Sequence, residues 1–111
     1  MARYSSIQEV IASYPARFEP SKAQGLDDKV LMDLQGEGGG QWVLHVHDGT
    51  VDVREGTTDD PTLTVHAPAD VWLSVENGET NPMMALMTGK VKLKGSVPFA
   101  TKFMGMFGGR V

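Results

Sequence analysis

The feature that most constrains the fold is a two-residue turn between two runs of alternating apolar and polar residues. Asp48 and Gly49 separate residues 42–47 from residues 50–55. An Asp-Gly pair in this setting is the strongest short signal for a β-hairpin, because both turn positions require positive φ angles. A turn of this length also fixes the register of the two strands. The facing pairs are then His47 with Thr50, Val46 with Val51, His45 with Asp52, Leu44 with Val53, and Val43 with Arg54.

The register gives the hairpin two different faces, because side chains alternate along a strand. The apolar face carries Trp42, Leu44, Val46, Val51 and Val53, and the polar face carries His45, His47, Asp52 and Arg54. The same alternation runs through residues 30–34, 62–66 and 90–94, which makes five predicted strands. One apolar and one polar face per strand is typical of a sheet that is covered on one side only.

Helix signals flank these strands. A first helix is capped by Ser5 or Ser6 and is expected to end at Pro15. Two short helices are predicted between the fourth and fifth strands, and a last helix follows Gly95. These three later helices cover about residues 68–76, 82–88 and 98–107. The pattern predicts an α+β fold of two layers, a five-stranded, mostly antiparallel sheet with helices on one face, in a single domain over residues 1–111.

Composition excludes several classes of protein. No run of about 18 apolar residues is present, so no segment of the sequence reads as a membrane-spanning helix. The absence of cysteine excludes a disulfide framework, a thiol nucleophile and a cysteine zinc site. The net charge of −4 gives no signature of nucleic-acid binding and argues against broad attraction to anionic membranes. Residues 1–10 hold no signal-peptide apolar region, so a cytoplasmic location is expected.

Polar clusters provide only weak signals for catalysis or for a cofactor. His45 and His47 share a strand face with Asp52 and could bind a metal ion, which leaves a metal-dependent enzyme as one alternative. The simpler interpretation is the solvated face of a sheet, with no metal. The glycines at 38–40 lack the lysine and the Ser or Thr of a phosphate loop, so no cofactor is expected. Carboxylates at 59–60, 76 and 79 are interpreted as turn and helix-end residues, so the chain is not expected to be an enzyme.

The C-terminal third is unusually rich in methionine and phenylalanine. Five of the seven methionines lie from Met83 onward, beside Phe99, Phe103 and Phe107. A small domain has too little interior to bury so much apolar surface, and such an excess marks a pocket, a groove or an interface. Methionine is suited to adaptable apolar sites, because its side chain is unbranched and polarizable. A pocket is favoured, and a protein-interaction or dimerisation module that uses the same helices is the other alternative.

Several short motifs, taken in order, resemble the sterol carrier protein 2 family. The early ones are Phe18-x-Pro20-x-Lys22-Ala23-x-Gly25, Trp42-x-Leu44-x-Val46-x-Asp48-Gly49 and Asp60-Pro61-x-Leu63-Thr64. The densest is Asn77-Gly78-Glu79-x-Asn81-Pro82, followed by Ala85-x-Met87-x-Gly89-Lys90-x-Lys92-x-Lys94-Gly95. Each motif is weak alone, and their order and spacing across residues 7–107 make the resemblance specific.

The resemblance implies a hydrophobic tunnel between sheet and helices that carries fatty acid, fatty acyl-CoA, sterol or phospholipid without catalysis. Lys102 and Arg110 are candidates to contact an anionic head group. The chain ends without a Ser-Lys-Leu peroxisomal address and holds no fused catalytic domain, so a free-standing carrier is expected, as a monomer or weak homodimer that contacts membranes transiently. The expected tunnel wall consists of Trp72, Val75, Met83, Met84, Met87, Phe99, Phe103, Met104 and Phe107.

Overall fold

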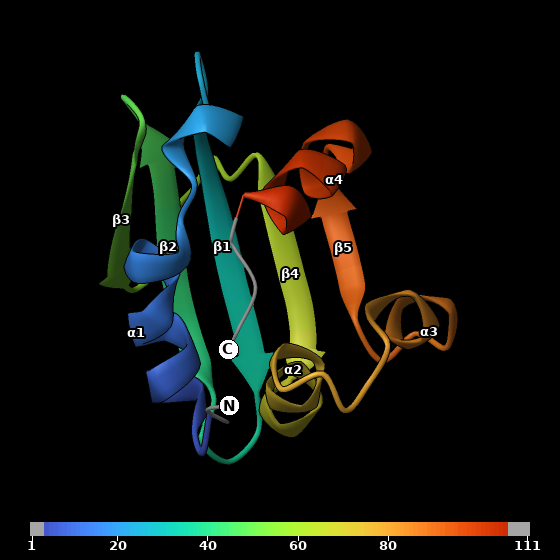
Figure 1. The fold of residues 1–111 in the computed structure, drawn as a ribbon. Helices are drawn as coiled ribbons and strands as arrows, with labels where there is room; N and C mark the ends of the chain where they lie inside the picture. The colour runs from blue at the N-terminus through green and yellow to red at the C-terminus, as the bar shows by residue number, and fades with distance from the viewer. Residues whose placement is uncertain (1–3, 107–111) are drawn as a thin grey trace.

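Five strands form one mixed sheet in the computed structural model, which describes residues 4–106 (Figure 1). They are β1 (Asp27–Gln35), β2 (Gly40–His47), β3 (Thr50–Glu55), β4 (Leu63–Pro68) and β5 (Lys92–Gly95). Their order across the sheet is β3-β2-β1-β4-β5. β1 and β4 are parallel, and the other three neighbouring pairs are antiparallel. The predicted mostly antiparallel sheet is confirmed.

The hairpin of β2 and β3 has the predicted register at all five facing pairs. Asp48 and Gly49 have φ angles of 51° and 72°, the positive values that this type of turn requires. A second glycine is required by close packing: a Cβ atom at Gly95 would lie 2.4 Å from the carbonyl oxygen of Thr62. The end of β5 therefore approaches β4 more closely than a side chain would allow.

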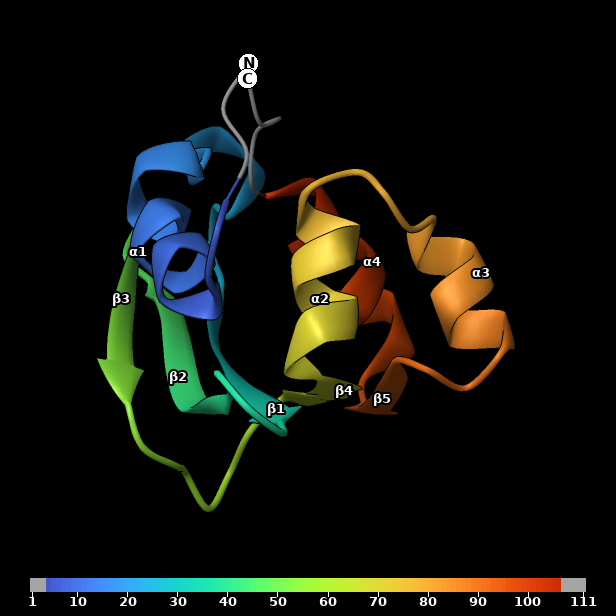
Figure 2. The same ribbon diagram turned by 90° about the horizontal axis from the view of Figure 1, so that it is seen from below.

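Helices cover one face of this sheet, as predicted. They are α1 (Ile7–Arg17), α2 (Ala69–Glu76), α3 (Pro82–Met87) and α4 (Val97–Gly105), with a short 3₁₀ helix at Pro20–Lys22. α1, α2 and α4 lie on the same side of the sheet, whereas α3 lies at the periphery, beyond α2 and α4 (Figures 1 and 2). Side chains of Ser6, Asn81 and Ser96 cap the starts of α1, α3 and α4.

The prediction that Pro15 ends the first helix is wrong. Proline lacks the N–H that would bond to the carbonyl of Ile11, but it leaves the rest of the turn intact. The helix continues to Arg17, whose side chain forms an ion pair with Glu76 of α2.

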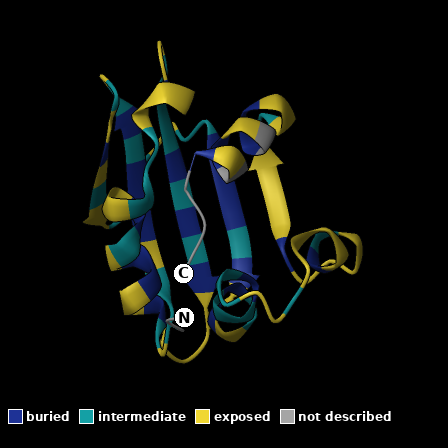
Figure 3. Ribbon diagram, viewed as in Figure 1, coloured by how far each residue is buried: buried dark blue, intermediate teal, exposed yellow. Residues whose placement is uncertain are grey.

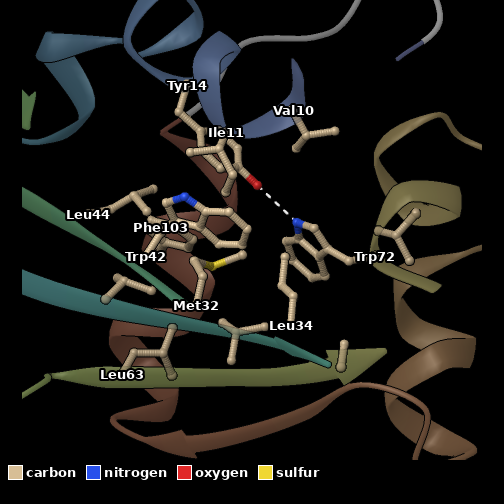
Figure 4. Packing of buried hydrophobic residues seen from close by; sticks show 14 of the residues in the cluster. Val10, Ile11, Tyr14, Met32, Leu34, Trp42, Leu44, Leu63, Trp72 and Phe103 are labelled. Carbon is tan, nitrogen blue, oxygen red and sulfur yellow. Dashed lines mark hydrogen bonds between the residues drawn. The ribbon is translucent and has the colours of Figure 1, made fainter. Parts of the chain in front are cut away.

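The core lies between the helices and the inner face of the sheet (Figure 3). Val30, Met32 and Leu34 of β1 alternate inward and are almost completely buried, together with Trp42 and Leu44 of β2 (Figure 4). The outer face is not wholly polar, because Val43 is paired there with Leu31 and is only 1% exposed.

Candidate functional site

An apolar cavity of about 40 Å³ lies between the sheet and three of the helices. It borders the inner face of β4 and β5 and is covered by α2, α3 and α4. Every lining side chain is apolar: Leu63, Val65, Trp72, Val75, Pro82, Leu86, Val91, Leu93, Ala100 and Phe103. The cavity therefore offers no hydrogen-bonding side chain to a polar guest.

The cavity is much smaller than a site that already holds a ligand. Pockets for small molecules run from about 300 to 1,000 Å³, whereas 40 Å³ is little more than the volume of one water molecule. At roughly 24 cal/mol per Å³, an empty cavity of this size costs only about 1 kcal/mol. A ligand larger than this volume requires the walls to move apart.

The wall formed by α4 is held at both ends of the helix. The hydroxyl of Ser96 accepts a hydrogen bond of 3.2 Å from the backbone N–H of Phe99. Beyond the other end, the carbonyl of Met106 accepts a bond of 2.7 Å from the backbone N–H of Glu19. Phe99 and Phe103 are both buried, with ring centres 6.1 Å apart, and Phe103 faces the cavity.

The wall formed by α2 is fixed by a chain of hydrogen bonds, of which Figure 4 draws the buried one between Trp72 and Tyr14. Trp72 donates through Nε1 to the hydroxyl of Tyr14 at 3.0 Å, and Tyr14 donates to a carboxylate oxygen of Glu76 at 2.6 Å. Arg17 pairs with the other oxygen of Glu76 at 3.3 Å. Burial, reinforced by the negative charge of Glu76, raises the pKa of Tyr14 well above its usual value. Tyr14 therefore stays protonated and holds the Trp72 indole against the cavity.

The structure places the expected wall residues in different surroundings. Trp72, Val75 and Phe103 line the cavity, and Phe99 is buried beside it in α4. The three methionines of α3 face outward, with Met83 65%, Met84 55% and Met87 78% exposed. A short helix at the periphery presents one side to the cavity, and Pro82, Ala85 and Leu86 occupy that side. Lys102 is exposed and does not line the cavity. The side chain of Met104, and all of Phe107 and Arg110, lie outside the described residues.

Seven lining residues were not among the expected wall: Leu63, Val65, Pro82, Leu86, Val91, Leu93 and Ala100. The alternation of the strands does contain the signal for Leu63, Val65, Val91 and Leu93, since all four were predicted to point inward. The alternation does not predict the order of the strands, and it is this order that brings β4 and β5 together at one edge of the sheet.

The two histidines of β2 lie on the outer face of the sheet, as predicted. Their rings stack at 4.3 Å. His45 contacts Asp27 at 2.6 Å, and His47 contacts Asp52 at 2.5 Å. The hydrogen bond of His47 to Asp52, and a second one to Asp48, raise the pKa of His47. The hydrogen bond with His45 lowers the pKa of Asp27.

No group of three or more His, Asp or Glu side chains within residues 4–106 is placed to hold a metal ion. His66 lies in β4 and is separated from His45 and His47 by β1. The side chain of His66 contacts Asp33 instead. Asp60 pairs with Lys29 at 3.3 Å. Among residues 4–106, no helix is long and apolar enough to cross a bilayer.

Comparison with known proteins gives a consistent family assignment. The model of the SCP-2 sterol transfer family matches residues 8–108. Human hydroxysteroid dehydrogenase-like protein 2 is 33% identical over 73 residues, which are 65% of this chain and 18% of that protein. The chain thus spans about a fifth of the length of the curated relatives that it matches.

Solved structures show the same fold at low sequence identity. A sec-alkylsulfatase, Pisa1 from Pseudomonas sp., is 18% identical with a TM-score of 0.80, covering 96% of this chain and 17% of that one. The solution structure of palmitated SCP2L2 from Aedes aegypti is 21% identical with a TM-score of 0.75, covering 90% of this chain and 92% of that one.

Proposed function

Since the chain belongs to the SCP-2 sterol transfer family, we propose that it binds one long-chain lipid in the cavity beneath α2, α3 and α4 and carries it. The family and its solved members support sterol or lipid carriage in general. The observation that carries the proposal for this chain is the cavity itself, which is apolar throughout and bounded by a helix at the periphery.

A flexible acyl chain suits this cavity better than a rigid ring system. The closed cavity must widen to admit any lipid, and an acyl chain can enter through a narrow opening and adjust to its walls. Leu86, Leu93 and Phe103 can change side-chain conformation without losing a hydrogen bond, because their side chains are apolar. The palmitated relative from Aedes aegypti, which has the same fold, supports this choice of ligand.

The energies favour a filled site over an empty open one. An open, dry cavity of about 300 Å³ would cost roughly 7 kcal/mol. Transfer of a 16-carbon chain from water supplies a nominal ~12 kcal/mol, at about 0.8 kcal/mol per methylene group. Binding of the ligand therefore offsets the cost of widening the cavity from its volume of about 40 Å³.

The proposed activity is binding and carriage without catalysis. None of the cavity-lining residues is ionisable, and His45 and His47 lie on the opposite side of the sheet. Tyr14 and Glu76 bond to each other, and their role is to position Trp72.

Titration with palmitate, followed by NMR of methyl groups, tests the proposal. Palmitate should shift the methyl signals of Leu63, Val65, Leu86 and Val91, which line the cavity. The methyl groups of Val43, buried on the outer face of the sheet, are the control and should not move. Uniform small shifts, or no shift at a ligand excess, would contradict lipid binding in this cavity.

A further inference from the structure

A patch of exposed apolar side chains borders the cavity, and one of them, Leu93, also lines it. Within residues 4–106, the exposed large apolar side chains all fall between residues 83 and 97: Met83, Met84, Met87, Leu93 and Val97. The first three form what we call the methionine face of α3, because positions i, i+1 and i+4 project to one side of a helix. Figure 3 shows α3 and β5 as largely exposed elements at the same side of the molecule.

The charges that follow this face in the chain have one sign. Lys90, Lys92 and Lys94 are exposed and follow α3 directly in the chain. Beyond Glu79 the sequence contains no Asp or Glu. Residues 80–111 carry a net charge of +5 and residues 1–79 a net charge of −9, which together give the chain's −4. The chain is therefore strongly polarised along its sequence, and its positive segment contains all five exposed large apolar side chains of residues 4–106.

This combination fits an anionic apolar surface better than a second copy of the chain. A two-fold dimer through the patch would bring the lysine rows of both copies together. Lysines on an edge strand such as β5 also oppose strand pairing between copies. A membrane has no such conflict, since apolar side chains enter the acyl boundary while basic side chains contact anionic head groups.

We infer that the methionine face of α3 docks onto membranes containing anionic phospholipid, with Lys90, Lys92 and Lys94 at the head groups. The other side of α3 carries Pro82 and Leu86, which line the cavity, so docking brings one cavity wall to the bilayer. Docking is independent of the proposed lipid binding, because it requires no ligand in the cavity.

Sedimentation with vesicles tests the apolar part of this docking. The chain should bind vesicles of equal parts phosphatidylcholine and phosphatidylserine, and binding should weaken as salt is added. A variant with Met83→Gln, Met84→Gln and Met87→Gln should bind at least about tenfold more weakly. The three side chains are exposed, so the thermal midpoint should be unchanged and confirms that the variant is folded. A folded triple variant that binds like the unmodified chain overturns the inference.

A second pair of variants tests the charges. Lys92→Gln with Lys94→Gln should weaken binding to the anionic vesicles by about 25-fold, at roughly fivefold for each lysine. Lys22→Gln with Arg54→Gln makes the same change in net charge on exposed residues distant from α3 in the sequence, and should retain binding. Equal loss in both double variants, or equal binding to pure phosphatidylcholine vesicles, overturns the role of these lysines.

Light scattering tests the alternative, in which a second copy of the chain covers the methionine face of α3. A monomer that binds vesicles supports docking on a membrane. A dimer that dissociates in the methionine variant, in a chain that binds no vesicles, overturns the inference in favour of a second copy.

Discussion

Filling the cavity with a larger side chain should separate its role in ligand binding from its role in stability. Ala100 lies in α4, is buried and lines the cavity. Ala100→Val adds two methyl groups at the wall of a space of about 40 Å³. Ala12 is an exposed alanine inside α1, so Ala12→Val is a matched control that carries the same helix cost and fills no cavity.

The expected magnitudes follow from the cavity volume. Eliminating 40 Å³ of empty space returns about 1 kcal/mol, and valine in a helix costs about 0.5 kcal/mol relative to alanine. Ala100→Val should therefore be about 0.5 kcal/mol more stable than the unmodified chain, and Ala12→Val about 0.5 kcal/mol less stable. The same methyl groups occupy space that the ligand needs, so palmitate affinity should fall at least tenfold, or about 1.4 kcal/mol.

Urea denaturation and a fluorescent fatty acid displacement assay measure the two effects. Ala12→Val should bind palmitate as the unmodified chain does. If Ala100→Val also binds normally, and is destabilised as much as Ala12→Val, then the cavity neither contributes the calculated cost nor receives the ligand.

Three further changes probe the surroundings of the cavity. Phe103→Asp should lower stability by at least about 3 kcal/mol and abolish palmitate uptake. Lys92→Asp, on the outer face of the sheet, should change stability by less than about 0.5 kcal/mol. Equal denaturation midpoints for the two variants would refute this. Tyr14→Phe should cost about 1–3 kcal/mol in urea denaturation, because it leaves buried polar groups without a partner, and a loss near zero would count against the buried chain. The raised pKa of His47 means that its contribution to stability is fully present below the unfolded-state value of 6.5 and is lost as pH rises through the folded-state value. Asp52→Asn should therefore bring the His47 pKa measured by NMR closer to 6.5, and an unchanged titration would exclude this contact.

The local features of the fold were predictable from the sequence. The register of the hairpin follows from a turn of two residues with positive φ angles, and the period of two then assigns every side chain of β2 and β3 to a face. The start of α3 is equally local, because the side chain of Asn81, directly before Pro82, accepts hydrogen bonds from the next backbone N–H groups. Each of these features depends on residues close together in the chain.

Features that depend on distant residues were not predictable. No local signal shows that β1 pairs with β4 in parallel, because 27 residues lie between Gln35 and Leu63 in the chain. Nor does a local signal show that α1 continues past Pro15 to Arg17, whose side chain pairs with Glu76 of α2.

The candidate site, too, was predictable in part only. Composition indicated excess apolar surface in the C-terminal third, but composition does not say which way each side chain faces. Phe103 turns into the cavity, whereas Met83, Met84 and Met87 turn outward because Ala85 and Leu86 form the inner side of α3. The sequence favoured a pocket, and the structure divides the apolar excess between a cavity and an exposed patch.

Native mass spectrometry of the purified chain tests the central claim most directly. The chain is incubated with palmitate, and the bound mass is identified after extraction. We expect a complex with one fatty acid per chain for the unmodified protein and for Ala12→Val. The same complex should be strongly reduced for Ala100→Val. A spectrum that shows only the mass of the unliganded chain, with palmitate in excess, would contradict it.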